Sequence, residues 1–113
     1  MPFFKYLDEH ADITDITFRD RKRLGPLDKV AQQIMRGPSP FSNAERELFA
    51  AYVSGLNECQ FCYGSHVAVA ENFGVSPLLV ADLLEDIDAT ILHKKLKPIF
   101  ANLGKSVSFP ITS

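Results

Sequence analysis

The sequence lacks a long uninterrupted run of apolar residues, although 46% of its 113 residues are hydrophobic. A membrane-spanning helix needs about 20 consecutive apolar residues, so no such helix is predicted. The first ten residues, MPFFKYLDEH, include charges and hold no apolar core of signal-peptide length. We therefore expect a soluble, cytoplasmic protein without a membrane partner.

The sequence also lacks an excess of charge of one sign. Twelve basic and 14 acidic residues are well mixed along the chain and give a formal net charge of −2. Domains that bind nucleic acid usually present a basic patch or stripe, which this balance does not provide. The short basic run RDRKR at 19–23 is better interpreted as a solvated loop than as a phosphate site. Nucleic acid is therefore not an expected partner.

Cysteine is scarce, and the two in the chain, Cys59 and Cys62, both lie in the stretch ECQFCYGSH at 58–66. Reducing compartments rarely keep structural disulfides, and one short bridge would constrain little of the chain. A c-type haem requires CxxCH, whereas Tyr63 follows the second cysteine here. The spacing instead leaves a metal site, a reactive dithiol or two buried apolar cysteines as alternatives.

Helical signals extend along most of the chain, and the body of the chain contains no hairpin signal. Ser42 and Glu45 form a capping box, Ser76–Pro77 is a helix start, and Gly74 suits the position just after a helix end. The predicted helices cover 26–36, with Pro26 near its N1 position, 45–56, 59–73, 77–85, and 89–103, which Asp88 would cap. We predict an all-α fold in which residues 1–103 form a single compact helical domain and 104–113 form a tail.

The predicted helix at 45–56 has two different faces. When each residue advances 100°, one face carries large apolar side chains: Leu48, Phe49, Tyr52, Val53 and Leu56. The opposite face carries Glu47 among small residues, namely Ala50, Ala51 and Ser54. Small side chains let another helix approach closely beside that carboxylate. Taken alone, Glu47 is equally compatible with a surface carboxylate that merely favours the helix dipole.

The predicted helix at 59–73 places Cys59, Cys62 and His66 within about 60° of one another. Cys59 would lie at or near the N-cap and Cys62 in the first turn. Thiols at such helix starts commonly have a lowered pKa, because the helix dipole and unpaired N–H groups favour the thiolate. His66 lies one turn after Cys62, where it can accept or relay the thiol proton.

Two alternatives to a reactive dithiol remain. Zinc could use Cys59, Cys62 and His66, but a closed tetrahedral site needs a fourth ligand, which only His10, His93 or a carboxylate could supply. The cysteines could also act as small buried hydrophobes. A thioredoxin fold would require strands around the CxxC motif, which the helical pattern does not provide. We favour a redox-active dithiol on a helical scaffold, without a metal or bound cofactor.

The stretch ERELFAAYVSGLNECQFCYGSH at 45–66 resembles the signature of the alkylhydroperoxidase D-like branch of the carboxymuconolactone decarboxylase family. That signature combines a glutamate on one helix with CxxC and a histidine at the start of the next. Glu47, Cys59, Cys62 and His66 occupy these positions here. The better-studied alkylhydroperoxidases carry a histidine between the cysteines, whereas this chain has Gln60 and Phe61.

The resemblance, to small peroxidase-related members in particular, implies an all-helical fold that assembles as trimers or hexamers. It also implies an antioxidant peroxidase that reduces hydroperoxides through a Cys59–Cys62 dithiol/disulfide cycle, with Glu47 and His66 as a proton relay. An external thiol or dithiol carrier would supply the reducing equivalents. The alternatives are a protein disulfide reductase and a non-enzymatic redox-sensing module in which the same cysteines oxidise slowly.

Overall fold

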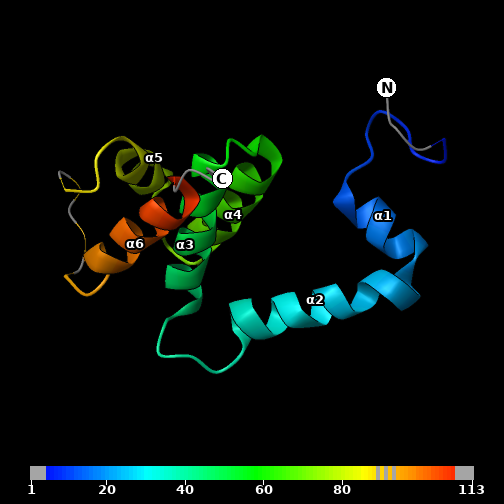
Figure 1. The fold of residues 1–113 in the computed structure, drawn as a ribbon, viewed down its shortest axis with the longest axis horizontal. Coiled ribbons are helices and arrows are strands. Elements are labelled where there is room, and N and C mark those ends of the chain that lie inside the picture. Colours follow the sequence, from blue (N-terminus) through cyan, green and yellow to red (C-terminus); the bar gives the residue numbers. More distant parts are fainter. Residues whose placement is uncertain (1–4, 89, 91, 93, 109–113) are drawn as a thin grey trace, which may run out of the picture. The chain divides into compact units, whose positions relative to one another are not determined.

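The structure, a computed structural model, describes residues 5–88, 90, 92 and 94–108. These residues form six α-helices and no strand, so the all-α prediction is confirmed (Figure 1). In chain order the helices are α1 (Ile13–Arg19), α2 (Arg21–Arg36), α3 (Asn43–Leu56), α4 (Gln60–Asn72), α5 (Pro77–Glu85) and α6 (Lys97–Ser108). The chain divides into two compact units, an N-terminal unit up to Pro38 and a C-terminal unit from Ser39 onward.

The N-terminal unit consists of α1 and α2, which contact each other. Helix α1 was not predicted, although Asp12 and Asp15 form a capping box at its start that the sequence displays. Asp12 accepts a hydrogen bond from the Thr14 backbone N–H at 2.8 Å. Neither α1 nor α2 contains a buried residue. As far as the structure describes it, from residue 5 to Pro38, this unit therefore consists of well-capped helices without an apolar core of its own.

Helix α2 begins five residues earlier than predicted, at Arg21 instead of Pro26. The Asp20 side chain caps it and accepts a hydrogen bond from the Arg23 backbone N–H at 3.4 Å. The Arg23 guanidinium also lies 3.3 Å from the Asp20 carboxylate. Pro26 is consequently inside the helix rather than at its N1 position, where it cannot donate the usual hydrogen bond to the carbonyl of Lys22.

The C-terminal unit is organised around α3, which packs against α4, α5 and α6 (Figure 1). Its core joins residues from α3, α5 and α6 with Leu96; the buried members are Leu48, Ala51, Tyr52, Val80, Leu83, Leu96 and Phe100. The rings of Tyr52 and Phe100 meet edge to face with their centroids 5.1 Å apart. Burial of these side chains stabilises the unit and fixes α3 as the support for α4.

Most helix boundaries of the C-terminal unit agree with the sequence prediction. Ser42 and Glu45 form the predicted capping box, with backbone-to-side-chain hydrogen bonds of 3.0 and 3.1 Å. Ser76 caps α5, Pro77 opens it, and Gly74 after α4 has a φ of +92°. Such a φ strains any side chain that carries a Cβ, so glycine suits this position. The local capping chemistry therefore sets where α3, α4 and α5 begin or end.

The predicted helix at 89–103 is wrong in its position. Residues 89, 91 and 93 lie outside the described residues, and the described residues from 90 to 96 are not helical. Helix α6 begins at Lys97, which places Pro98 in its first turn. A proline in the middle of the predicted helix would have removed a hydrogen bond and clashed with the preceding turn. The helix also continues to Ser108, into the predicted tail 104–113, of which 109–113 lie outside the described residues.

Candidate active site

The sharp turn between α3 and α4 positions the first cysteine. Asn57 ends α3, and Glu58 has a φ of +57°, which a residue with a side chain adopts only at some cost. The backbone N–H of Cys59 donates to the Ser54 carbonyl at 3.1 Å, which attaches the turn to α3. Cys59 is the N-cap of α4, as the sequence predicted. The conformation of this turn therefore fixes one sulfur at the helix start.

Cys59 and Cys62 are joined by a disulfide, and their Cα atoms are 5.4 Å apart. This separation lies within the range that disulfides span without backbone movement. The Cys59 sulfur also accepts a hydrogen bond from the Cys62 backbone N–H at 3.3 Å, so it acts as the capping atom of α4. Both cysteines are partly exposed. The first turn of α4 therefore holds a disulfide that solvent can reach.

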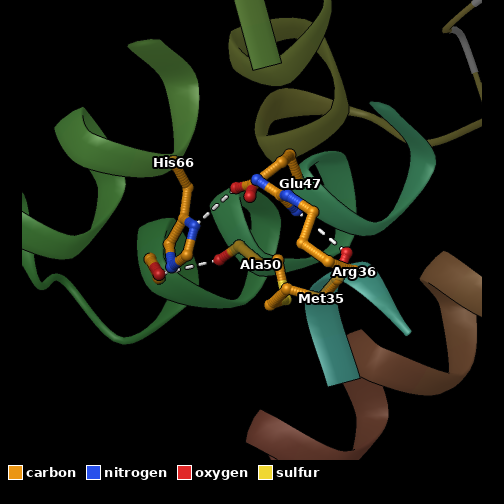
Figure 2. A network of polar contacts seen from close by, with 6 residues as sticks. Met35, Arg36, Glu47, Ala50 and His66 are labelled. Atoms are coloured by element: carbon orange, nitrogen blue, oxygen red, sulfur yellow. Dashed lines mark hydrogen bonds and ion pairs between the residues drawn. The ribbon is translucent and has the colours of Figure 1, made fainter. Parts of the chain in front are cut away.

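Glu47 and His66 form the second pair of the site, across the α3–α4 contact. His66 Nδ1 lies 2.7 Å from Glu47 Oε2, and Figure 2 shows the two side chains pointing toward each other. The Glu47 side chain is only 4% exposed, whereas the His66 side chain is 33% exposed. The interpretation of Glu47 as a surface carboxylate is therefore wrong. Glu47 is one of the few buried polar residues of the described chain.

The small residues around Glu47 explain how this carboxylate becomes buried without displacing α4. Ala51, one turn after Glu47, is completely buried beneath the neighbouring helices. The predicted close approach of a second helix to this face agrees with the observed packing of α3 against α4. A buried carboxylate is costly unless another group pairs with it, so the hydrogen bond to His66 offsets part of that cost.

The carboxylate also orients the imidazole. A histidine that donates from Nδ1 to an acceptor keeps its Nε2 atom as the proton-accepting position. Side chains on a helix lean toward its N-terminus, and His66 follows Cys62 by four residues on α4. The imidazole therefore lies one turn after Cys62 on α4, with its Nδ1 atom toward the buried carboxylate of Glu47.

A small cavity of about 190 Å³ lies next to Cys59. Its lining comes from the end of α3, the start of α4 and α5, namely Ser54, Gly55, Glu58, Cys59, Gln60, Tyr63 and Leu84. Gly55 approaches Leu84 so closely that a Cβ there would lie 2.6 Å from a Leu84 methyl carbon. The sequence analysis did not identify Gly55 or Leu84, because tertiary packing alone brings α5 to this position.

The sequence analysis named His10 and His93 as possible further ligands of a metal. His10 is exposed in the N-terminal unit and its ring lies 3.7 Å from the Glu9 carboxylate, while His93 lies outside the described residues. Within the described ranges, no group of three His, Cys, Asp or Glu side chains is arranged to hold a metal ion. None of the helices described is both long and apolar enough to cross a bilayer.

Comparison with protein families matches residues 26–94 to the carboxymuconolactone decarboxylase family. The matched segment covers more than half of the chain and includes Glu47, both cysteines and His66. A search of curated proteins and a search of solved structures each found no match. On the extent of this match, the chain belongs to the carboxymuconolactone decarboxylase family, which covers the alkylhydroperoxidase D-like proteins.

Proposed function

We propose that this protein is a thiol-dependent hydroperoxide reductase in which Cys59 and Cys62 cycle between dithiol and disulfide. The observation that carries the proposal is the disulfide at the start of α4 beside a buried glutamate–histidine pair. A disulfide alone serves equally well as a slow redox sensor. A carboxylate that orients a histidine one turn from a cysteine is typical of nucleophile activation.

In the reduced protein, Cys62 is the nucleophile. His66 accepts the Cys62 thiol proton at Nε2, and Glu47 stabilises the resulting imidazolium across the 2.7 Å contact. The position of Cys62 in the first turn of α4 favours the thiolate further, because the N-terminal end of a helix attracts negative charge. Removing the proton from Cys62 therefore requires only groups that α3 and α4 already hold in place.

The thiolate attacks the distal oxygen of a hydroperoxide, the O–O bond breaks, and Cys62 becomes a sulfenic acid. The departing alkoxide takes the proton from His66 and leaves as an alcohol. The Cys59 thiol then condenses with the sulfenic acid, which forms the disulfide and releases one water. The Cα separation of 5.4 Å in the disulfide form lies within the range that such a bond spans, which supports condensation between these two cysteines.

An external dithiol carrier returns the protein to the reduced state. One carrier thiolate attacks the Cys59 sulfur, the Cys59–Cys62 bond breaks, and Cys62 leaves as a thiolate. The second carrier thiol then attacks the mixed disulfide, which releases Cys59 and the oxidised carrier. We assign the attack to Cys59 because the cavity of about 190 Å³ opens beside this cysteine.

The test is the rate at which the fully reduced protein loses two thiols to a small excess of an organic hydroperoxide. Intact mass follows the loss of two hydrogens. We expect a rate orders of magnitude above that of a free thiol. The variant C59S should stop at a sulfenic acid on Cys62, and C62S should not react at an enhanced rate.

The same assay separates the alternatives. A rate no faster than that of free cysteine would contradict the peroxidase. Fast oxidation by protein disulfides together with slow oxidation by hydroperoxides would identify a disulfide reductase instead. An enhanced rate that is retained in C62S and lost in C59S would keep the peroxidase but exchange the roles of the two cysteines.

A further inference from the structure

The cavity of about 190 Å³ beside Cys59 has a carboxylate in its wall. Among the described residues that line it, Glu58 alone is charged, and the others offer apolar or neutral polar groups: Ser54, Gly55, Cys59, Gln60, Tyr63 and Leu84. Glu58 directly precedes Cys59 in the chain and is exposed. A group that enters the cavity to reach the Cys59 sulfur therefore comes close to the Glu58 carboxylate.

The charge of this carboxylate is not neutralised within the part of the chain that the structure describes. Glu47 pairs with His66, and Glu45 lies 3.3 Å from the ammonium of Lys95. No described side chain forms an ion pair or a hydrogen bond with the Glu58 carboxylate. An exposed charge without a counter-charge acts on groups nearby and is weakened mainly by dissolved salt. The field of Glu58 therefore reaches a molecule that enters the cavity.

The backbone at Glu58 is unusual for a residue with a side chain. Its φ of +57° lies in the left-handed region, which glycine adopts without the penalty that a Cβ brings. The turn between α3 and α4 accounts for the positive φ but not for a glutamate at this position. Backbone outliers of this kind cluster at functional sites, so this one motivates a functional hypothesis for the side chain.

We propose that Glu58 is a specificity-determining residue for the reductant of the disulfide. It favours dithiol carriers that present a neutral or positively charged group beside the attacking sulfur, and it disfavours carriers with a negative group there. The inference rests on the proposed function, because it concerns the step that returns the disulfide to the dithiol.

The chemistry of that step gives the charge of the carrier its effect. One carrier thiolate attacks the Cys59 sulfur, Cys62 leaves as a thiolate, and the second carrier thiol then releases Cys59 and closes the carrier disulfide. The attacking sulfur is negative in every carrier, so Glu58 repels it equally in all of them. Selection therefore acts on the charge of the rest of the carrier.

Two pairs of small dithiols isolate this charge. Dimercaptopropanol and dimercaptopropanesulfonate share a carbon skeleton but carry a hydroxyl and a sulfonate, respectively, and dithiothreitol and dithiobutylamine compare a neutral dithiol with a cationic one. Each rate of protein reduction is divided by the rate at which the same dithiol reduces a small uncharged disulfide, which removes differences in thiol reactivity. We expect the anionic dithiol to be about five- to tenfold slower than its neutral counterpart, and added salt to diminish this ratio.

The variant Glu58→Gln removes the charge while it keeps the length of the side chain and the same demand on the backbone. The ratio between the neutral and the anionic dithiol should fall to about one and lose its dependence on salt. In E58K the anionic dithiol should become the faster of the two. Glu71→Gln is the matched control, because it removes an exposed carboxylate near the other end of α4 and should keep the ratio of the unaltered protein.

The assay starts from the disulfide form and contains no hydroperoxide, so its result is independent of the peroxidase rate. Equal normalised rates for the anionic and neutral dithiols would overturn the inference, as would a disulfide that none of the four dithiols reduces. A ratio that persists in E58Q, or that E71Q abolishes equally, would also overturn it. Selection that depends on Glu58, together with slow oxidation by hydroperoxides, would contradict the proposed peroxidase and leave this inference in place.

Discussion

The N-terminal and C-terminal units are both helical, and each contains a helix that opens with a capping box, yet among the described residues only those of the C-terminal unit include buried side chains. Helix α1 has its Asp12–Asp15 box, and α3 has its Ser42–Glu45 box. Capping stabilises the end of a helix, whereas the position of a helix in a fold comes from the burial of an apolar face. The comparison shows that capping sets where these helices begin. Packing decides which of them can hold an active site.

The candidate site illustrates the difference. Glu47 is buried on the face of α3 where α4 packs on small residues, and α3 is itself held by the core of the C-terminal unit. His66 then has a fixed partner at 2.7 Å. The N-terminal unit also carries carboxylates and a histidine, but His10 and its neighbour Glu9 are both exposed. Similar residue types therefore differ in the chemistry that they can perform. The C-terminal unit buries the carboxylate of its pair and orients the imidazole, whereas the N-terminal unit leaves its pair exposed.

The largest contrast should come from removing one aromatic ring from each unit. Phe100 is 0% exposed and contacts Tyr52 and Phe49, whereas Phe18 in α1 is 66% exposed. Phe100→Ala should lower the free energy of unfolding by about 3–5 kcal/mol. Phe18→Ala should change it by less than about 0.5 kcal/mol. Denaturant unfolding monitored by circular dichroism measures both, and equal losses would mean that the N-terminal unit also has a core.

The second contrast concerns chemistry. Glu47→Gln preserves the shape of the buried side chain but cannot stabilise an imidazolium at His66, so the rate of thiol loss to a hydroperoxide should fall about 100-fold or more. Glu45→Gln is the matched control, because Glu45 lies on the same helix, where it caps the helix start and pairs with Lys95. Its rate should remain that of the unaltered protein. A passive sensor would instead be insensitive to both substitutions.

The sequence predicted much of the site because its determinants are local. A capping box, a helix start at Cys59, and a small-residue face around Glu47 can each be read within one or two helical turns. The disulfide spacing and the position of His66 one turn after Cys62 also follow from helix geometry. These features do not require knowledge of the tertiary fold.

The parts that the sequence could not supply depend on contacts between distant residues. The cavity beside Cys59 requires Leu84 from α5. The positive φ at position 58 could not be predicted, because the residue there is a glutamate and not a glycine. The start of α6 was misplaced because the apolar spacing continues upstream of Pro98, although the proline already limits the helix. Helix α1 was missed because its apolar residues are weakly periodic, while its cap at Asp12 was readable.

A smaller effect should separate the two capping boxes. Ser42→Ala removes the acceptor for the Glu45 backbone N–H, which should cost about 1 kcal/mol because unfolding α3 also unfolds the core. Asp12→Ala should fray α1 but leave the melting temperature of the C-terminal unit unchanged, since α1 buries no residue. Thermal unfolding together with amide hydrogen exchange in α1 measures both. An equal shift of the melting temperature would indicate that the units unfold together.

The smallest effect is the response to acid. The pKa of Glu45 is lowered from its ordinary value of 4.5, first by the hydrogen bond from the Ser42 backbone N–H and also by Lys95, whose ammonium lies 3.3 Å away. A lowered pKa means that the stabilisation of the fold by ionised Glu45 is complete above about pH 4.5 and disappears as the pH falls through the folded-state pKa.

Glutamine at position 45 keeps the capping geometry without titrating, so Glu45→Gln should flatten this part of the pH–stability curve. Unfolding measured between pH 6 and pH 3 for both proteins tests this, and parallel curves would assign the acid sensitivity of α3 to another carboxylate. The pKa of Asp12 is also lowered, by hydrogen bonds from Thr14, but protonation of Asp12 should affect α1 alone, because α1 contains no buried residue.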